Sequence, residues 1–217
     1  MKRSKCLPRL ATAMLSVAIT LPLVAQDTPK TEDKSATTRP GEADMMATMM
    51  EMAKPGENHK IFAGLVGTWT YTVKWWMSPQ TPPSESTGTT VCKSVMDGRY
   101  FISNHTGKLQ MPGSDGKMMD MEFQGMSIEG YDNAKKKYVS SWIDNMGTGI
   151  ENFEGTYDPA TKTLTYVGSY EPMPGMVTNM RQKLTLTDAD HHTMEMFEIR
   201  GGTDVKTMEI VYTRKTT

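Results

Sequence analysis

Histidines and carboxylates are the residues of this 217-residue chain that could do acid–base or metal chemistry. There are four histidines: His59, His105, His191 and His192. The last two close the run Asp-Ala-Asp-His-His at 188–192, and imidazole and carboxylate groups are ligands for zinc or copper. We place this run in a turn before a strand, and neighbouring strand residues point to opposite faces. A solvated turn is therefore favoured, and no metal site is predicted.

Asp144 is the carboxylate whose surroundings are most informative. It shares one face of an alternating segment with Tyr138, Ser140 and Trp142. Inside a cavity, loss of hydration would raise its pKa and a polar ligand could bind to it. The glycines that follow, Gly147 and Gly149, favour a place at the rim. The sequence contains no Gly-x-Ser-x-Gly elbow, phosphate-binding loop or paired-cysteine motif, so we predict no catalytic residues and no enzyme.

Short alternating segments must position these residues. In residues 67–77, Trp69, Tyr71 and Trp75 lie on one face, and threonines dominate the other. Asp97-Gly98 between two such segments is a strong hairpin signal. The predicted strands cover residues 67–77, 87–96, 99–109, 119–131, 137–145, 150–157, 162–170, 176–187, 193–200 and 205–214.

Hairpin-length links join these strands, and no helix separates them. This pattern predicts an all-β fold, a closed antiparallel up-and-down barrel of about ten strands, with a sandwich as the alternative. A short helical turn before residue 67 would plug the barrel. The inward face is not decided for weakly alternating strands. Residues 119–130 are the hardest case, because Gly125 could mark a bulge that resets the register.

The N-terminal quarter has three parts. Residues 1–25 have the charged start and apolar stretch of a signal peptide, which predicts an exported protein, periplasmic or secreted. Residues 26–42 are polar and predict a disordered linker. Residues 43–54 predict a methionine-rich helix capped by Asp44, and residues 55–217 form the barrel domain.

Charge and apolar content limit the kinds of partner that the protein is expected to bind. The net charge of −1, which falls to about −5 without the signal peptide, offers no basic field for nucleic acid. No transmembrane segment is expected after signal cleavage. Cys92 is the one cysteine outside the signal peptide, and we predict that it is buried in a strand. The oligomeric state is left open.

Two readings apply to the five methionines at 45, 46, 49, 50 and 52. Thioethers bind Cu(I), so the helix could bind copper. They also make a pliant apolar face that could rest on the domain, and this second reading is favoured.

Several motifs resemble known families. Gly67-x-Trp69 after a short helix, with a late Arg214, resembles the lipocalin-like (calycin) barrels, which implies that Arg214 packs over the Trp69 indole at the closed end. Further motifs resemble the exported bacterial family called domain of unknown function 1579, over about residues 55–215. They are the segment 59–69, Asp97-Gly98-Arg99, Gly130-Tyr131-Asp132, residues 137–144, Gly155-Thr156-Tyr157-Asp158 and residues 209–215. This likeness implies the barrel and no particular reaction.

A barrel of this kind predicts an internal binding site. We expect a small, partly apolar or planar molecule to bind among Trp69, Tyr71, Trp75, His105, Tyr138, Trp142 and Asp144. Some calycin barrels bind haem through a histidine, and His105 is the best-placed candidate, but a histidine hydrogen-bonded in the wall is favoured and no cofactor is predicted. The alternatives are copper binding by the methionine-rich helix and a filled interior without a ligand.

Overall fold

The computed structural model describes residues 41–112 and 117–216. The predicted signal peptide and nearly all of the predicted linker lie outside these residues. Over the described ranges, no helix has the length and apolarity needed to cross a bilayer.

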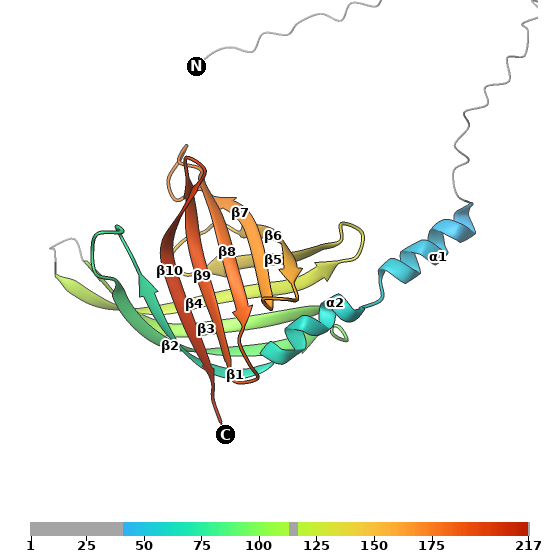
Figure 1. Ribbon diagram of the computed structural model, residues 1–217, viewed down its shortest axis with the longest axis horizontal. Helices are drawn as coiled ribbons and strands as arrows, with labels where there is room; N and C mark the ends of the chain where they lie inside the picture. The colour runs from blue at the N-terminus through green and yellow to red at the C-terminus, as the bar shows by residue number, and fades with distance from the viewer. Residues whose placement is uncertain (1–40, 113–116, 217) are drawn as a thin grey trace, which may run out of the picture. The chain divides into compact units, whose positions relative to one another are not determined.

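Ten antiparallel strands form a closed barrel (Figure 1). Each strand pairs with its neighbours in sequence, and β1 closes the ring by pairing with β10. The strands are β1 (Gly67–Trp75), β2 (Ser84–Val95), β3 (Tyr100–Pro112), β4 (Met118–Asp132), β5 (Lys137–Asp144), β6 (Glu151–Asp158), β7 (Thr163–Tyr170), β8 (Thr178–Leu186), β9 (His191–Arg200) and β10 (Thr203–Arg214). The predicted fold class is thus confirmed. Closure leaves no unpaired edge strand.

The turns form where the sequence has turn residues. Asp97 and Gly98 have φ values of 57° and 82° in the β2–β3 hairpin, and glycine adopts such values without steric cost. Asp132 and Asp158 each accept a backbone N–H two residues ahead, from Ala134 and Ala160, which stabilises the β4–β5 and β6–β7 hairpins.

The strand pairing rules out the possible bulge at Gly125 and corrects the placement of His191 and His192 in a turn. β4 pairs with β3 without interruption through Gly125, so there is no bulge there. The register shift lies between Lys206 and Met208, on β10. His191 and His192 also belong to strand β9 and not to the turn before it.

Two short helical segments precede β1 and close one end of the barrel. They are α2 (Glu57–Lys60) and the 3₁₀ turn η1 (Ile61–Leu65). Phe62 is fully buried, and its ring lies 5.4 Å from that of Phe101 and 5.8 Å from that of Tyr138. The helical segment therefore fills the barrel end with an aromatic side chain.

The methionine-rich helix α1 spans Glu42–Met52. Its N-cap is Gly41, so the predicted Asp44 cap was wrong; Asp44 lies in the first turn. No residue of α1 is buried. The chain after it is held to two barrel turns: Asn133 Nδ2 donates to the Met52 and Lys54 carbonyls, and Arg99 Nε donates to the Ala53 carbonyl.

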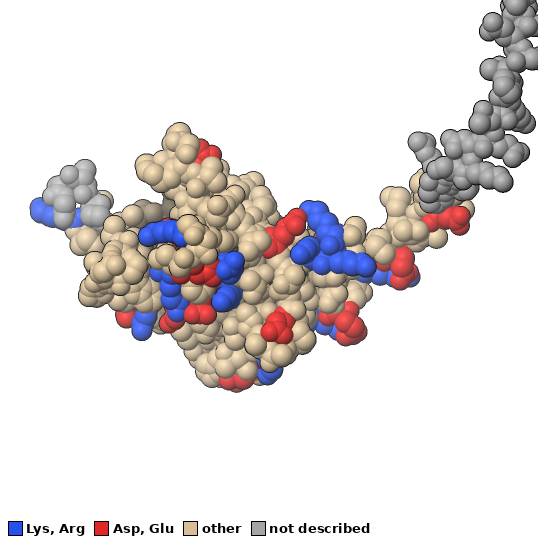
Figure 2. All heavy atoms as spheres, turned by 45° about the horizontal axis from the view of Figure 1, so that its top comes forward, with Lys and Arg blue, Asp and Glu red and all other residues tan. Residues whose placement is uncertain are grey.

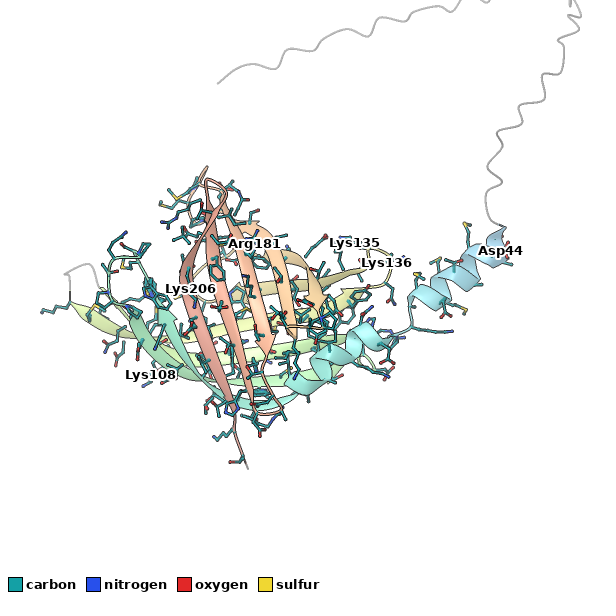
Figure 3. All side chains as sticks on the ribbon, viewed as in Figure 1. Asp44, Lys108, Lys135, Lys136, Arg181 and Lys206 are labelled. Carbon is teal, nitrogen blue, oxygen red and sulfur yellow. The ribbon has the colours of Figure 1, made fainter. Side chains whose placement is uncertain are left out.

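The outer surface of the barrel carries mixed charges (Figure 2). Figure 3 labels two of these charged residues, Arg181 on β8 and Lys206 on β10. Arg181 pairs with Asp204, and Lys206 pairs with Glu195 at 2.7 Å and with Glu209. Such partly exposed pairs contribute little stability individually.

Candidate functional site

The candidate site is the interior of the barrel, whose lining follows from the strand register. Trp69, Tyr71, Val73 and Trp75 face inward on β1 and lie opposite Arg214, Tyr212, Ile210 and Met208 of β10. Because directly paired residues share a face, the register extends this assignment around the ring. It also decides the face of β4: Glu129, Ser127 and Gly125 point inward.

The closed end is sealed, and we call it the floor: Phe62, Leu65, Trp69, Tyr138 and Arg214. The Trp69 indole is 2% exposed, and its Nε1 donates to the Leu65 carbonyl at 2.8 Å. The Arg214 guanidinium carbon lies 4.1 Å from the centroid of that indole, and its nitrogens donate to the Gly64, Val66 and Ala189 carbonyls. Tyr138 Oη donates to the Asn58 side chain. The polar atoms of the floor therefore have partners.

The part of the barrel interior above the floor, which we call the chamber, is lined by two unlike walls. The hydroxyl wall consists of small inward-facing side chains on β2 to β5: Thr90, Ser103, Ser127 and Ser140. The aromatic wall consists of large inward-facing side chains on β7 to β10: Tyr166, Met180, Met194, Met196 and Tyr212. Small side chains facing large ones give the chamber one polar side and one apolar side.

Glycines on several strands let aromatic rings lie against the wall. A Cβ on Gly125 would lie 2.5 Å from the Trp142 ring, and one on Gly88 would lie 2.3 Å from the Tyr71 ring. A Cβ on Gly155 would lie 2.7 Å from the ring of Tyr166. The absence of side chains at these positions thus sets how far the rings are withdrawn from the chamber.

His105 joins the two walls. Its Nδ1 lies 2.8 Å from the Thr90 hydroxyl, and its ring lies 5.1 Å from Trp142, 6.1 Å from Tyr71 and 6.3 Å from Tyr212. Burial lowers its pKa to about 4, so the imidazole is neutral at pH 7. Nε2 makes no hydrogen bond within the described residues. His105 is only partly buried, so this atom is available from the barrel mouth.

The acids at the mouth are Asp144, Glu151 and Glu198, and Glu198 is hydrogen-bonded by Arg200. Asp144 ends β5, as predicted for a rim residue, and its oxygens accept from Trp142 Nε1 at 2.8 Å and from the Met146 N–H at 2.9 Å. Burial, and then the charge of Asp144, raise the pKa of Glu151. Both oxygens of Asp144 are thus engaged in holding the Trp142 ring and the following turn.

Glu129 is a carboxyl group in the middle of the chamber. It pairs with Phe101 on β3 and Ser140 on β5, and the Ser127 hydroxyl hydrogen-bonds to it. Burial raises its pKa to about 7. Burial, and then the negative charge of Glu129, raise the pKa values of Tyr166 and Tyr212, which places the acid beside the aromatic wall.

Two buried polar atoms facing inward lack a hydrogen-bond partner in the described part of the chain: Tyr166 Oη and His192 Nδ1. The His192 ring stacks on Tyr212 at 4.3 Å and meets the Trp69 edge at 4.3 Å. Burial, then Arg214 and His105, lower its pKa to about 3. An unpaired buried polar atom costs about 1–3 kcal/mol, so such atoms call for a partner.

The structure distributes the residues predicted to bind a ligand over three places. Trp69 and Tyr138 belong to the floor. Tyr71, His105 and Trp142 lie in the chamber. Trp75 and Asp144 lie at the mouth.

Sequence reasoning did not identify Glu129, Tyr166 and Tyr212, and it considered His192 only as a metal ligand in a turn. Glu129 could have been found by counting back across the Asp132-Asn133 turn, because Tyr131 pairs with Tyr138 and so shares its inward face. Tyr166 pairs with Gly155 in the same way. His192 gave no such signal, since its segment reads as a turn.

The remaining candidate sites are hollows outside the barrel, metal-binding groups and the Cys92 thiol. Hollows on the outside of the barrel include one of about 370 Å³ among the threonines of β1, β2 and β10 and one of about 440 Å³ beside Trp76 and Lys206. Within the described ranges, no group of three His, Cys, Asp or Glu side chains could hold a metal ion. Cys92 is 3% exposed, and burial raises its thiol pKa to about 11, so it is an unreactive wall residue.

Comparisons with known proteins identify a family and return matches among solved structures. The family described as "Protein of unknown function (DUF1579)" matches residues 54–214. The crystal structure of Rv2717c from M. tuberculosis has a TM-score of 0.49 and 14% identity, and the match covers 75% of this chain and all of that one. A protein of unknown function of the DUF3598 family from Nostoc punctiforme has a TM-score of 0.24 and 8% identity, covering 74% and 100%. No curated protein matches.

Proposed function

This chain belongs to the DUF1579 family, whose function is unknown, and from its own geometry we propose that it binds a small, partly apolar molecule in the chamber. The observation that carries the proposal is the contrast between sealed floor and accessible chamber. His105 and Trp142 face inward and remain partly exposed, whereas Trp69 and Phe62 are 2% and 0% exposed. An aromatic and thioether wall with a few polar groups is the usual lining of a ligand site.

A binding role fits the contacts better than a catalytic one. Both oxygens of Asp144 already accept hydrogen bonds, so this carboxylate is held as a structural support for Trp142. His105 and His192 have pKa values of about 4 and 3, well below the range that suits a general base at neutral pH.

The test is a titration with N-phenyl-1-naphthylamine, an apolar fluorescent probe. We expect the probe to brighten on binding and to quench the tryptophan fluorescence. The Ser127→Leu variant fills the chamber and should weaken binding at least about tenfold, the equivalent of 1.4 kcal/mol. The matched control is Thr89→Leu, which fills the threonine-lined hollow outside the wall instead. Equal binding by both variants, or loss only in Thr89→Leu, would place the probe outside the chamber and refute the proposal.

A second candidate is copper binding by α1. All five of its methionines are 44–65% exposed, so their thioethers do not rest on the barrel as an apolar face. Met45, Met49 and Met52 follow one another at helical spacing on one side. We expect Cu(I) to be retained against a chelator and lost when these three become leucine, which keeps the helix propensity. Substituting the exposed Met173 and Met176 is the control; equal retention by both variants would exclude α1.

We further propose that the protein acts outside the cytoplasm, since residues 1–25 have the composition of a cleaved signal peptide. Mass spectrometry of the protein purified from its native host should give an N-terminus close to Gln26. An intact Met1 or Lys2 on the mature protein would contradict export by this signal.

A further inference from the structure

Resting on the proposed binding chamber, we infer that its ligand is an organic cation: a protonated amine carried on an apolar body, with its nitrogen bound beside Glu129. Three features favour such a ligand: the placement of Glu129, the charges on the inward faces and the rings around them.

Glu129 is a buried acid on the inward face of β4. It is 8% exposed, whereas Ile128 on the outer face of the same strand is 39% exposed. Among the described residues, the Ser127 hydroxyl alone donates a hydrogen bond to it, which leaves most of the acceptor capacity of the carboxylate unused. Tyr166 Oη, on the opposite wall, is buried and also has no partner. A ligand that donates hydrogen bonds here would satisfy both groups.

The chamber has acids and lacks the bases that would neutralise them. Glu129, Asp144 and Glu151 face inward on β4, β5 and β6. Among the described residues, no lysine or arginine lies on an inward face between Arg214 at the floor and Arg200 at the rim. Arg181, Lys183 and Lys206 are on the outer face. An anionic guest would therefore meet only carboxyl groups, and a cation would be favoured.

A ring near the acid also suits a cation. The charge of Glu129 acts on Tyr212, which belongs to a cluster with Tyr71, His105 and Trp142 whose centroids lie 5.1 to 6.3 Å apart. Aromatic faces attract ammonium groups. The methionines of the aromatic wall then accommodate the apolar body.

Binding would be coupled to a proton. The Glu129 pKa of about 7 means that the acid is largely neutral at pH 6. The titratable groups that face it are Cys92 on β2, Tyr166 on β7 and Tyr212 on β10, and burial raises the pKa of each, so they stay uncharged below pH 8. An entering ammonium would form an ion pair with the carboxylate, and the carboxyl proton would leave to solvent.

Three probes of one shape test the inference by calorimetry on the full chain: 1-naphthylmethylamine (cation), 1-naphthalenemethanol (neutral) and 1-naphthoate (anion). We expect the amine to bind at least about tenfold tighter than the alcohol, and the anion to bind least. From pH 6 to pH 8 the ionised fraction of Glu129 rises about tenfold, so amine affinity should rise by the same factor while alcohol affinity stays constant. In buffers of different ionisation enthalpy, amine binding at pH 6 should release close to one proton.

Substitutions at Glu129 and at a control position test whether Glu129 causes the preference for the amine. Glu129→Gln should weaken the amine about tenfold at pH 8 and remove the pH dependence, with no change for the alcohol. The matched control is Glu122→Gln, an exposed acid on the outer face of the same strand. Should Glu129→Gln fail to fold, the comparison of probes and the proton release on the wild-type protein still decide the question.

The outcomes separate the two proposals. Equal affinity for amine and alcohol, or tighter binding of the anion, overturns the cation inference and leaves the binding chamber standing. Binding of none of the three probes, and no binding of N-phenyl-1-naphthylamine, overturns both.

Discussion

The floor and the chamber are built by the same ten strands, yet they treat polar groups in opposite ways. In the floor, Trp69 Nε1 and three nitrogens of Arg214 all donate to backbone carbonyls, and His59 Nδ1 accepts the Gly56 N–H. In the chamber, Tyr166 Oη has no partner and Glu129 keeps most of its acceptor capacity free. The difference separates a part that stabilises the barrel from a part that is ready to bind, and substitutions in the two should therefore have different consequences.

The largest effect on stability is expected in the floor. Phe62→Ala removes a fully buried ring that packs on Phe101 and Tyr138, and should lower the free energy of unfolding by about 3–5 kcal/mol. Urea denaturation measures it. Val167→Ala, on the exposed outer face of β7, serves as the control and should change it by less than about 0.5 kcal/mol. A loss for Phe62→Ala no larger than that of the control would remove the distinction between floor and chamber.

Glu129→Gln should show that ionisation of Glu129 lowers the stability of the folded protein. A folded-state pKa of about 7 against an unfolded value near 4.5 means that the folded protein holds this proton more tightly. Stability due to this group is present below pH 4.5 and is lost as pH rises through 7, by about 2–3 kcal/mol at most. The variant should therefore match the wild type at pH 5 and exceed its stability at pH 8.

Urea denaturation should measure the free energy of unfolding of the wild type and of Glu129→Gln at each pH, and the difference between them is the quantity to compare. The difference is needed because His105 and His192 change stability with pH in the opposite direction. Their lowered pKa values remove stability as the pH falls below 6.5 in both proteins. A difference that does not change between pH 5 and pH 8 would show that Glu129 does not titrate in this range.

Arg214→Lys is expected to have an intermediate effect. Lysine keeps the charge but cannot stack as a plane on Trp69 while donating to the Gly64 and Val66 carbonyls. We expect a loss of about 1–2 kcal/mol in thermal or urea unfolding. Probe affinity should be unchanged, since the floor does not contact the ligand; a parallel loss of probe binding would mean that floor and chamber are not separate.

Trp142→Phe should have the smallest effect on stability, under about 1 kcal/mol, because the ring is only partly buried. It should nevertheless remove most of the tryptophan quenching caused by N-phenyl-1-naphthylamine. Trp76→Phe is the control, since Trp76 lies outside, beside Lys206. Quenching that survives in Trp142→Phe and disappears in Trp76→Phe would reverse the assignment.

Sequence reasoning could predict the floor far better than the chamber. The Trp69-to-Trp75 alternation and the Asp-Gly turn are local signals, and strand boundaries followed from them to within a few residues. The chamber depends on which residues meet across strands. The inward face of β4 was undecided because its apolar residues change face at Gly125. Met119, Met121 and Phe123 precede that glycine, and Met126 and Ile128 follow it on the other face. Only pairing with β3 and β5 puts Glu129 inside. The unpartnered state of Tyr166 Oη is likewise a property of the assembled barrel.

The wall glycines have a consequence for what the protein could accept. Because the ring of Trp142 rests on Gly125, a single methyl group added behind that ring would push it toward the axis and shrink the space for a guest. The size limit would thus change from behind the lining, without replacing any residue that touches the guest. Relatives that differ at this position should differ in the size of molecule they admit before they differ in its chemistry.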